Sequence, residues 1–188
     1  GFIEDTDWGA FTDDFDCTIE YFESALTLID EGSGITNKHG NDSWAYDQRG
    51  IDFVMEDEFG YNNGIHDQIF REKSSRNEYQ KLIIKAAAND NYPSETGGCH
   101  MRDAYVHTLS QKGNLLMDER SYEPCILYVN GAYWGVYELR EKVDDHDFTN
   151  HYYQQGQYDL QFLKTWGGTW AEYDAGGTAE TDWDTFKA

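Results

Sequence analysis

The chain has 188 residues with 36 acidic and 14 basic side chains, which give a formal net charge of −22 at pH 7. Such an acidic surface repels phosphate backbones, so nucleic acid is not expected as a partner. A hydrophobic content of 39% and an aromatic content of 16% are typical of a folded domain and exclude a disordered chain. No apolar run approaches bilayer thickness, so we expect no membrane span.

The N-terminal third is rich in strand-forming residues. The stretches "CTIEYFES" and "ALTLIDEG" predict strands within residues 2–31. Gly32 and Gly34 are expected to end this pattern, and "TNKHGNDSW" is predicted to be a polar loop. "RGIDFVM" then predicts a strand whose apolar side chains share one face: Ile51, Phe53 and Met55.

The middle of the chain predicts a strand followed by the best helix. "KLIIKAAAND" could form either element, and we favour a strand because a polar loop closes it at residues 89–91. Lys85 interrupts this apolar run, so it needs either a partner anion or an exposed ammonium group. "MRDAYVHTLSQKG" predicts a helix that ends at Gly113. Its Arg102 and Asp103 could face the strand or form a surface pair.

The strongest local signal is Asn130-Gly131 between two aromatic-rich runs. This dipeptide favours a type I′ turn, because both of its residues adopt positive φ readily, and it predicts a β-hairpin. "DDHDFTNHYY" predicts a helix, "DLQFLK" a strand, and "TWGGTWAEYDAGG" a Gly- and Trp-rich loop. The order indicates an α+β fold with a mostly antiparallel sheet and one main helix.

Two sets of residues, an acidic run with histidines and three cysteines, could form a reactive site. Asp144, Asp145 and Asp147 lie with His146 and His151 in a possible metal cluster, which we interpret as the solvated start of a helix. No calcium loop, phosphate-binding glycine motif or nucleophile motif is present. Cys17, Cys99 and Cys125 are far apart and predict neither a zinc site nor a disulfide framework, and one bridge with a third thiol left over stays open.

The two ends of the chain suggest a longer parent protein. The sequence begins at Gly1, and its final "DWDTFKA" is interpreted as the first turn of a helix, with Thr181 or Asp182 as its cap. In that interpretation Trp183 and Phe186 begin an apolar stripe that continues beyond the sequence.

Several stretches together resemble the spore-coat CotH kinase family. They are "LYVNGAYWGVYELREKVDDHDF", "HGNDSWAYDQRGIDF", and "KLIIKAAANDN" followed by "MRDAYVHTLSQ", which cover most of residues 37–164. The resemblance implies a protein-kinase-like nucleotide lobe over 37–164, with a strand-rich segment at 1–36 before it. Residues 165–188 would then form a loop and the start of a truncated helix.

The resemblance also implies an activity. Members of the family transfer phosphate from ATP to Ser or Thr with Mg²⁺, and here the substrate would be a surface or coat protein. The parent protein would then be secreted, with an extracellular or cell-surface location.

Three residues become candidate nucleotide contacts through the resemblance: Arg49, Lys85 and Glu141. Gln48 and Arg49 occupy the family's basic pair, where Arg49 replaces the usual Lys and offers a bidentate phosphate contact. The stretch after Leu139 would be the hinge that meets adenine. The family's downstream Asn-Tyr-Tyr and Trp-Asp-x-Asp motifs are not found after Lys164, so we assign no catalytic residue and no metal ligand. The chain alone is therefore expected to be inactive.

Two alternative functions remain. The Gly- and Trp-rich segment could make this chain a noncatalytic extracellular module that binds carbohydrate or protein. Trp166, Trp170 and Tyr173 would then stack on sugar rings, or these side chains could instead pack beneath the loop. A degenerate family member that only scaffolds a partner is the third hypothesis.

Overall fold

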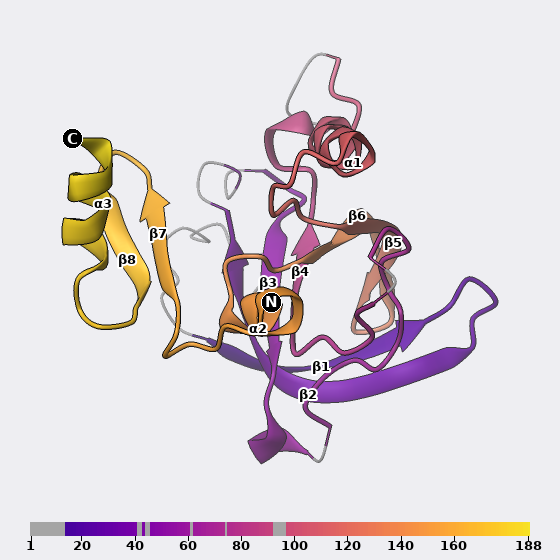
Figure 1. Cartoon of the computed structure of the whole chain (residues 1–188). Coiled ribbons are helices and arrows are strands. Elements are labelled where there is room, and N and C mark those ends of the chain that lie inside the picture. The colour runs from indigo at the N-terminus through magenta and orange to yellow at the C-terminus, as the bar shows by residue number, and fades with distance from the viewer. Residues whose placement is uncertain (1–13, 41–42, 44–45, 61, 74, 92–96) are drawn as a thin grey trace. The chain divides into compact units, whose positions relative to one another are not determined.

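The computed structural model describes residues 14–40, 43, 46–60, 62–73, 75–91 and 97–188. It divides into two compact units, residues 1–142 and 143–188. The described part of the first unit contains a six-stranded sheet, the helix α1 and two short 3₁₀ turns (Figure 1). Their bounds are β1 Phe15–Phe22, β2 Leu28–His39, β3 Gly50–Met55, η4 Asp57–Phe59, β4 Lys81–Lys85, η5 Ala88–Asp90, α1 Arg102–Gly113, β5 Tyr122–Val129 and β6 Ala132–Glu141.

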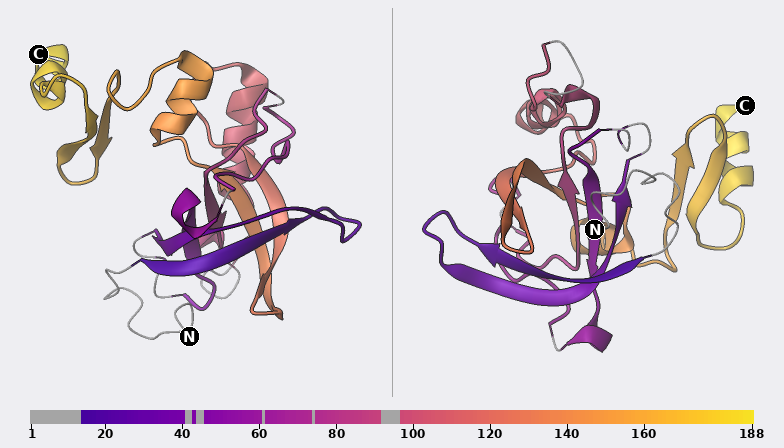
Figure 2. Two further views of the ribbon diagram at one scale, coloured as in Figure 1. Left: turned by 90° about the horizontal axis from the view of Figure 1, so that it is seen from below. Right: turned by 180° about the vertical axis from the view of Figure 1, so that it is seen from behind.

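The sheet of the first unit is antiparallel throughout its described strands. The strand order is β1-β2-β3-β4-β6-β5, so β4 lies between β3 and β6. The β1–β2 hairpin is long, and its tip extends past the other strands (Figure 2). This arrangement confirms the α+β class and the mostly antiparallel sheet.

The β5–β6 hairpin confirms the clearest local prediction. Asn130 has φ 52° and Gly131 has φ 77°, as a type I′ turn requires. Strands β3 and β4 also lie where the sequence predicts them. Three neighbouring side chains of β3 contribute to the core or pack against it: Ile51, Phe53 and Met55.

The prediction that Gly32 and Gly34 end a strand is wrong. Strand β2 runs through both glycines to His39, and Gly34 pairs with Met55 on β3. A Cβ on Gly32 would lie 2.3 Å from Met55 Cε, and one on Gly34 would lie 2.0 Å from the Val54 carbonyl oxygen. The glycines therefore allow β3 and Met55 to approach β2 closely.

One face of the sheet, here called the core face, carries the hydrophobic core. The segment that joins β3 to β4 covers this face, and Phe70 meets Tyr79 edge to face at 5.2 Å between ring centroids. The core consists of Phe53, Met55, Ile65, Ile69, Phe70, Tyr79, Leu82, Ile84, Ala86, Tyr137 and Leu139.

The cysteines of the chain form no disulfide. Cys17 and Cys125 pack against the core cluster. Burial raises the pKa of the Cys17 thiol to about 11 and that of Cys125 to about 12, so both stay protonated at neutral pH.

Helix α1 occupies the predicted range, but its apolar stripe does not face the protein. Met101, Tyr105 and Leu109 are exposed. The buried positions are Ala104 and Ser110. The helix instead directs polar groups inward, since Ser110 donates a 2.6 Å hydrogen bond to Glu119.

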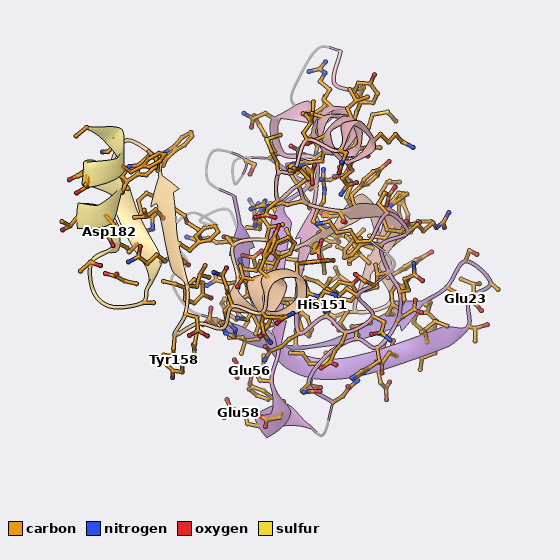
Figure 3. The ribbon with its side chains drawn as sticks, viewed as in Figure 1. Glu23, Glu56, Glu58, His151, Tyr158 and Asp182 are labelled. Atoms are coloured by element: carbon orange, nitrogen blue, oxygen red, sulfur yellow. The ribbon has the colours of Figure 1, made fainter. Side chains whose placement is uncertain are left out.

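Acidic side chains stand at exposed turns of the first unit. Figure 3 labels Glu23 at the tip of the β1–β2 hairpin, and Glu56 and Glu58 around η4. A hydrogen bond with Glu58 raises the pKa of Glu56. None of the helices in the described part of the chain has the length and apolar character that a membrane crossing requires.

The second unit consists of α2, a hairpin and α3. Helix α2 (His146–Tyr153) begins where the sequence predicts it. The Gly- and Trp-rich segment is not a plain loop, because it contains the strand β8 (Thr169–Asp174), which pairs with β7 (Gln161–Thr165). Tertiary pairing thus organises a segment whose glycines indicate only a turn.

The terminal helix α3 (Ala179–Lys187) begins earlier than predicted. Thr178 precedes it and donates to Asp182, while Asp174 accepts the Ala179 N–H at 2.9 Å. Trp183 and Phe186 therefore lie inside the helix, where their rings stack at 5.7 Å.

The close approach at Gly34 yields a stability prediction. Gly34→Ala should lower the free energy of unfolding by about 2 kcal/mol or more, because the new methyl group clashes with the β3 backbone. Urea unfolding measures this change. Gly60→Ala is the matched control, since a Cβ there meets nothing within 4 Å and φ is 171°. Equal stability of the two variants would contradict the packing argument.

Candidate functional site

The opposite face of the sheet, here called the charged face, carries ionised side chains. Alternation along the strands places several of them on this side, which include Asp52, Lys81, Lys85, Glu138 and Arg140. Lys85 lies directly opposite Glu138 across the β4–β6 pair. Helix α1 adds Asp103 to the same side, because Asp103 bonds to both Lys85 and Arg140.

Asp103 is the centre of an ion cluster. It accepts a hydrogen bond from Lys85 Nζ and one from Arg140 Nη2 at 3.0 Å, and His107 Nε2 lies 3.5 Å away. The bond with His107, followed by those of the two cations, lowers the pKa of Asp103 far below its usual range despite its partial burial. Its carboxylate therefore stays ionised and holds Lys85 in place at neutral pH.

Arg140 joins the ion cluster to the sheet. Its side chain is fully buried and also donates to Glu138 at 2.9 Å and 3.0 Å. Its guanidinium lies over the Tyr122 ring at 5.4 Å. The two cations, Lys85 and Arg140, are balanced by two anions, Asp103 and Glu138. Buried charges are stable when they are paired in this way.

A cavity of about 140 Å³ opens beside Lys85. It lies between the turn that joins β2 to β3 and the end of β4. The lining is basic, polar or small: His39, Gly40, Ser43, Gln48, Gly50, Lys85, Ala86 and Ala88. This volume is below the several hundred Å³ of a whole-cofactor pocket and suits a smaller anionic group.

The backbone after β4 has an unusual conformation next to this cavity. Ala87 and Ala88 both adopt left-handed φ, 59° and 50°, which costs non-glycine residues energy. Asn91 is fully buried and donates to the Ala86 carbonyl at 2.9 Å, and Tyr46 donates to Asn89 at 3.3 Å. The Tyr46–Asn89 bond ties the β2–β3 turn to η5, and the Asn91 bond holds the backbone at Ala86, which lines the cavity.

Asp90 determines where α1 starts. Its carboxylate accepts the backbone N–H groups of Cys99, Met101 and Arg102 at 2.9–3.0 Å. Burial raises the pKa of Asp90, but these bonds outweigh it and hold that pKa at about 2. The carboxylate caps the helix that carries Asp103, and sequence reasoning missed this role.

The three residues predicted as nucleotide contacts lie in different environments. Lys85 lines the cavity. Arg49 is half-buried and donates to the Tyr46 carbonyl at 3.3 Å, and it is not among the cavity residues although Gln48 and Gly50 are. Glu141 is fully buried away from the cavity lining.

Glu141 belongs to a separate ion cluster on the core face. Its carboxylate meets Arg76 and Lys73, each at 3.1 Å, and Arg76 lies over the Tyr79 ring at 4.7 Å. The Glu141 N–H donates to the Ser121 carbonyl. These contacts link the segment between β3 and β4 to the end of β6.

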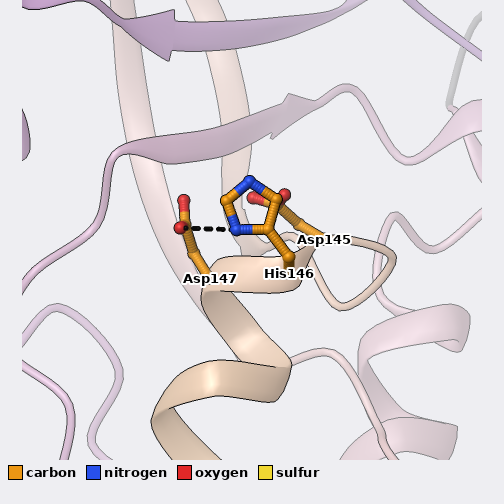
Figure 4. Close-up of side chains that lie close together, drawn as sticks. All are labelled: Asp145, His146 and Asp147. Carbon is orange, nitrogen blue, oxygen red and sulfur yellow. Dashed lines mark ion pairs between the residues drawn. The ribbon is translucent and has the colours of Figure 1, made fainter. Parts of the chain in front are cut away.

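The acidic run at the start of α2 brings possible ligand atoms together. Atoms of Asp145, His146 and Asp147 lie within 4.8 Å of one another (Figure 4). His146 pairs with Asp147 at 3.2 Å, and Asp145 accepts a hydrogen bond from Tyr173 at 3.1 Å. These groups have protein partners, and Asp145 is buried, so the interpretation of the run as a solvated helix start is wrong for this residue.

The donor set of the cavity does not fit a protein-held Mg²⁺. Magnesium takes carboxylate and phosphate oxygens, and no carboxylate is found among the described residues that line the cavity. Its basic and amide groups fit anionic oxygens instead. We therefore assign no step to magnesium here.

Comparison with known proteins identifies the family. Residues 37–185 match the family model described as CotH kinase protein. This match covers most of the chain, so the protein belongs to the CotH kinase family. Comparison with curated proteins and with solved structures found no match.

The Asp90 cap gives a prediction about stability and pH. Asp90→Ala should lower the free energy of unfolding by about 2 kcal/mol at pH 7, because three N–H groups lose their acceptor. The Asp90 pKa is depressed in the folded state, so this contribution is complete above about pH 4 and is lost as pH falls toward 2.

Urea titrations between pH 2 and pH 7 test this prediction. The gap between wild type and Asp90→Ala should close at the acidic end. Asp16→Ala, on exposed edge strand β1, is the control and should stay within about 0.5 kcal/mol of wild type. A gap independent of pH would rule out an ionised cap.

Proposed function

We propose that this protein binds ATP with its phosphate groups in the cavity beside Lys85. In this proposal the site belongs to a CotH kinase that transfers phosphate to Ser or Thr of a protein. The single observation that carries it is the ion pair between Lys85 on β4 and Asp103 on α1 at the edge of a basic cavity. Protein kinases hold the phosphate-binding Lys of a strand with a carboxylate of the following helix.

The order of elements supports the same function. A glycine-bearing turn between β2 and β3 precedes the strand with Lys85, the helix with Asp103 and then the β5–β6 hairpin. Gly40 of that turn and Gly50, the first residue of β3, line the cavity, where small residues let backbone and ligand approach closely. This is the order in which a kinase nucleotide lobe presents its phosphate-covering turn, lysine and helix.

The proposed roles differ among the predicted residues. Lys85 contacts phosphate, and Asp103 is a positioning residue that fixes the direction of its ammonium group. Arg49 donates to the Tyr46 carbonyl and does not line the cavity, so we assign it no phosphate contact. We propose that Glu141 stabilises the fold through Arg76 and Lys73 and does not touch nucleotide.

Calorimetry with ATP and Mg²⁺ tests the proposal. Lys85→Ala should weaken binding roughly tenfold or more, because a charge-assisted contact to phosphate is lost. Lys112→Ala, on the exposed last turn of α1, should bind as wild type does. Lack of binding by wild type, or equal affinities for wild type and Lys85→Ala, would refute the nucleotide site.

The exposure of two tryptophans favours a second candidate function, sugar binding by the β7–β8 hairpin. Trp166 is 76% exposed and Trp170 is 42% exposed, so these rings do not pack beneath the segment. Tyr173 is half-buried and bonds to Asp145, so it is less available for stacking. Exposed tryptophan faces are suited to sugar rings.

A glycan screen followed by calorimetry tests this second function. If the hairpin stacks on sugar, Trp170→Ala should weaken binding roughly tenfold, while Tyr158→Ala, at a fully solvated position outside the hairpin, should not change it. Failure of every glycan to bind the wild-type protein would dismiss the second candidate.

A further inference from the structure

The cavity has a second basic side chain, contributed by the end of β2. His39 is the last residue of that strand, pairs with Gly50, and lines the cavity together with Lys85. The sequence did not predict a role for His39, because that role depends on a neighbour on the adjacent strand β3.

Asp52 holds the His39 ring in a fixed orientation. The two side chains form a diagonal pair on the charged face of β2 and β3, and His39 Nδ1 lies 2.9 Å from Asp52 Oδ1. Burial raises the pKa of Asp52, but the hydrogen bond and charge of His39, followed by Lys142, lower it overall. The carboxylate is therefore ionised, and it can only accept a hydrogen bond.

The ionised carboxylate determines which ring nitrogen carries a proton. Because the ionised Asp52 Oδ1 lies 2.9 Å from Nδ1, a proton is favoured on this nitrogen in the neutral ring as well as in the cationic one. Nε2 is then the nitrogen that can meet a ligand. In the neutral ring Nε2 is a hydrogen-bond acceptor and repels phosphate oxygens. In the cationic ring Nε2–H is a donor that can bind them.

We propose that His39, oriented by Asp52, is a second phosphate-binding residue of this cavity and binds through Nε2–H when the ring is cationic. This inference rests on the proposed nucleotide site and adds a second contact to it. Lys85 and His39 would contact the phosphate groups from two strands, β4 and β2. Because a neutral ring presents an acceptor to phosphate, ligand binding would then weaken as pH rises.

The charged groups around His39 are consistent with this direction. On β3, Asp52 contacts the ring through Oδ1, and Lys142, the residue after β6, lies 3.4 Å from the other carboxylate oxygen, Oδ2. On β4, Lys85 is already paired with Asp103. Among these described neighbours, the direct contact of His39 is with the carboxylate.

The experiment measures binding of two ligands, ATP with Mg²⁺ and inorganic tripolyphosphate, by calorimetry at pH 6.0 and pH 8.0. His39→Gln should weaken both ligands about tenfold at pH 6.0 and much less at pH 8.0. For each ligand, the dissociation constant at pH 8.0 is divided by that at pH 6.0. In His39→Gln this ratio reports the ionisation of the ligand itself. The ratio should be larger in wild type, and the excess reports the charge of His39.

His66→Gln is the matched control. His66 pairs with Asp30 through Nδ1 at 3.1 Å, as His39 does with Asp52, but it lies outside the cavity lining. This variant should keep wild-type affinity and the wild-type pH ratio. Asp52→Asn, which leaves His39 in place, should reduce the pH 6.0 affinity because the ring cation loses its counter-charge. Urea unfolding of each variant verifies that it folds.

The outcomes separate this inference from the proposed function. If wild type binds neither ligand, the nucleotide site itself is refuted. If Lys85→Ala abolishes binding while His39→Gln keeps both the affinity and the pH ratio, the site stands and the role of His39 is overturned. If only ATP binds, and His39→Gln weakens it, then His39 meets another part of the nucleotide and the phosphate assignment is overturned.

Discussion

The arrangement of the first unit depends on the carboxylate of Asp103, where a helix meets the charged face of a sheet. Lys85 and Arg140 extend from adjacent strands, and Glu138 pairs with Arg140 within the sheet. Asp103 contacts both cations and thereby links the helix to β4 and β6. Asp90 supports the arrangement at the same end of the helix, because its carboxylate caps the helix start. The cavity beside Lys85 is therefore bounded by groups that strong electrostatic contacts keep in place.

The two faces of the sheet use buried charge for different purposes. On the core face, Glu141 has cationic partners on both of its oxygens and no exposed surface, so it links elements distant in sequence and has no surface left for a ligand. On the charged face, the carboxylates Asp52 and Asp103 each hold a basic residue at the rim of the cavity. Specific charge partners lower the pKa of both carboxylates, and such perturbed groups beside a cavity mark a candidate functional site. This contrast is the physical basis for proposing a phosphate site at Lys85 and a structural role for Glu141.

Family membership and local geometry support the proposed function independently. The CotH kinase match extends over residues 37–185, and the Lys85–Asp103 pair lies inside that range. The match was foreseeable from quoted stretches such as "LYVNGAYWGVYELREKVDDHDF", whose hairpin forms as expected. The nucleotide contacts predicted at Lys85, Arg49 and Glu141 stay predictions. The sequence did not reveal that Lys85 lines the cavity while Arg49 and Glu141 do not, because position in a sequence does not show which way a side chain faces.

The amino-acid sequence by itself determined the features governed by short-range physics: the Asn130-Gly131 turn, the apolar alternation of β3 and the start of α2. Only the tertiary structure decided the rest. Gly32 and Gly34 continue a strand because β3 approaches them closely, and the Gly- and Trp-rich segment gains a strand because β7 pairs with it. The pairs His39–Asp52, Lys85–Asp103 and Arg76–Glu141 join residues from separate elements. Their energies depend on desolvation and distance, which exist only once the chain has folded.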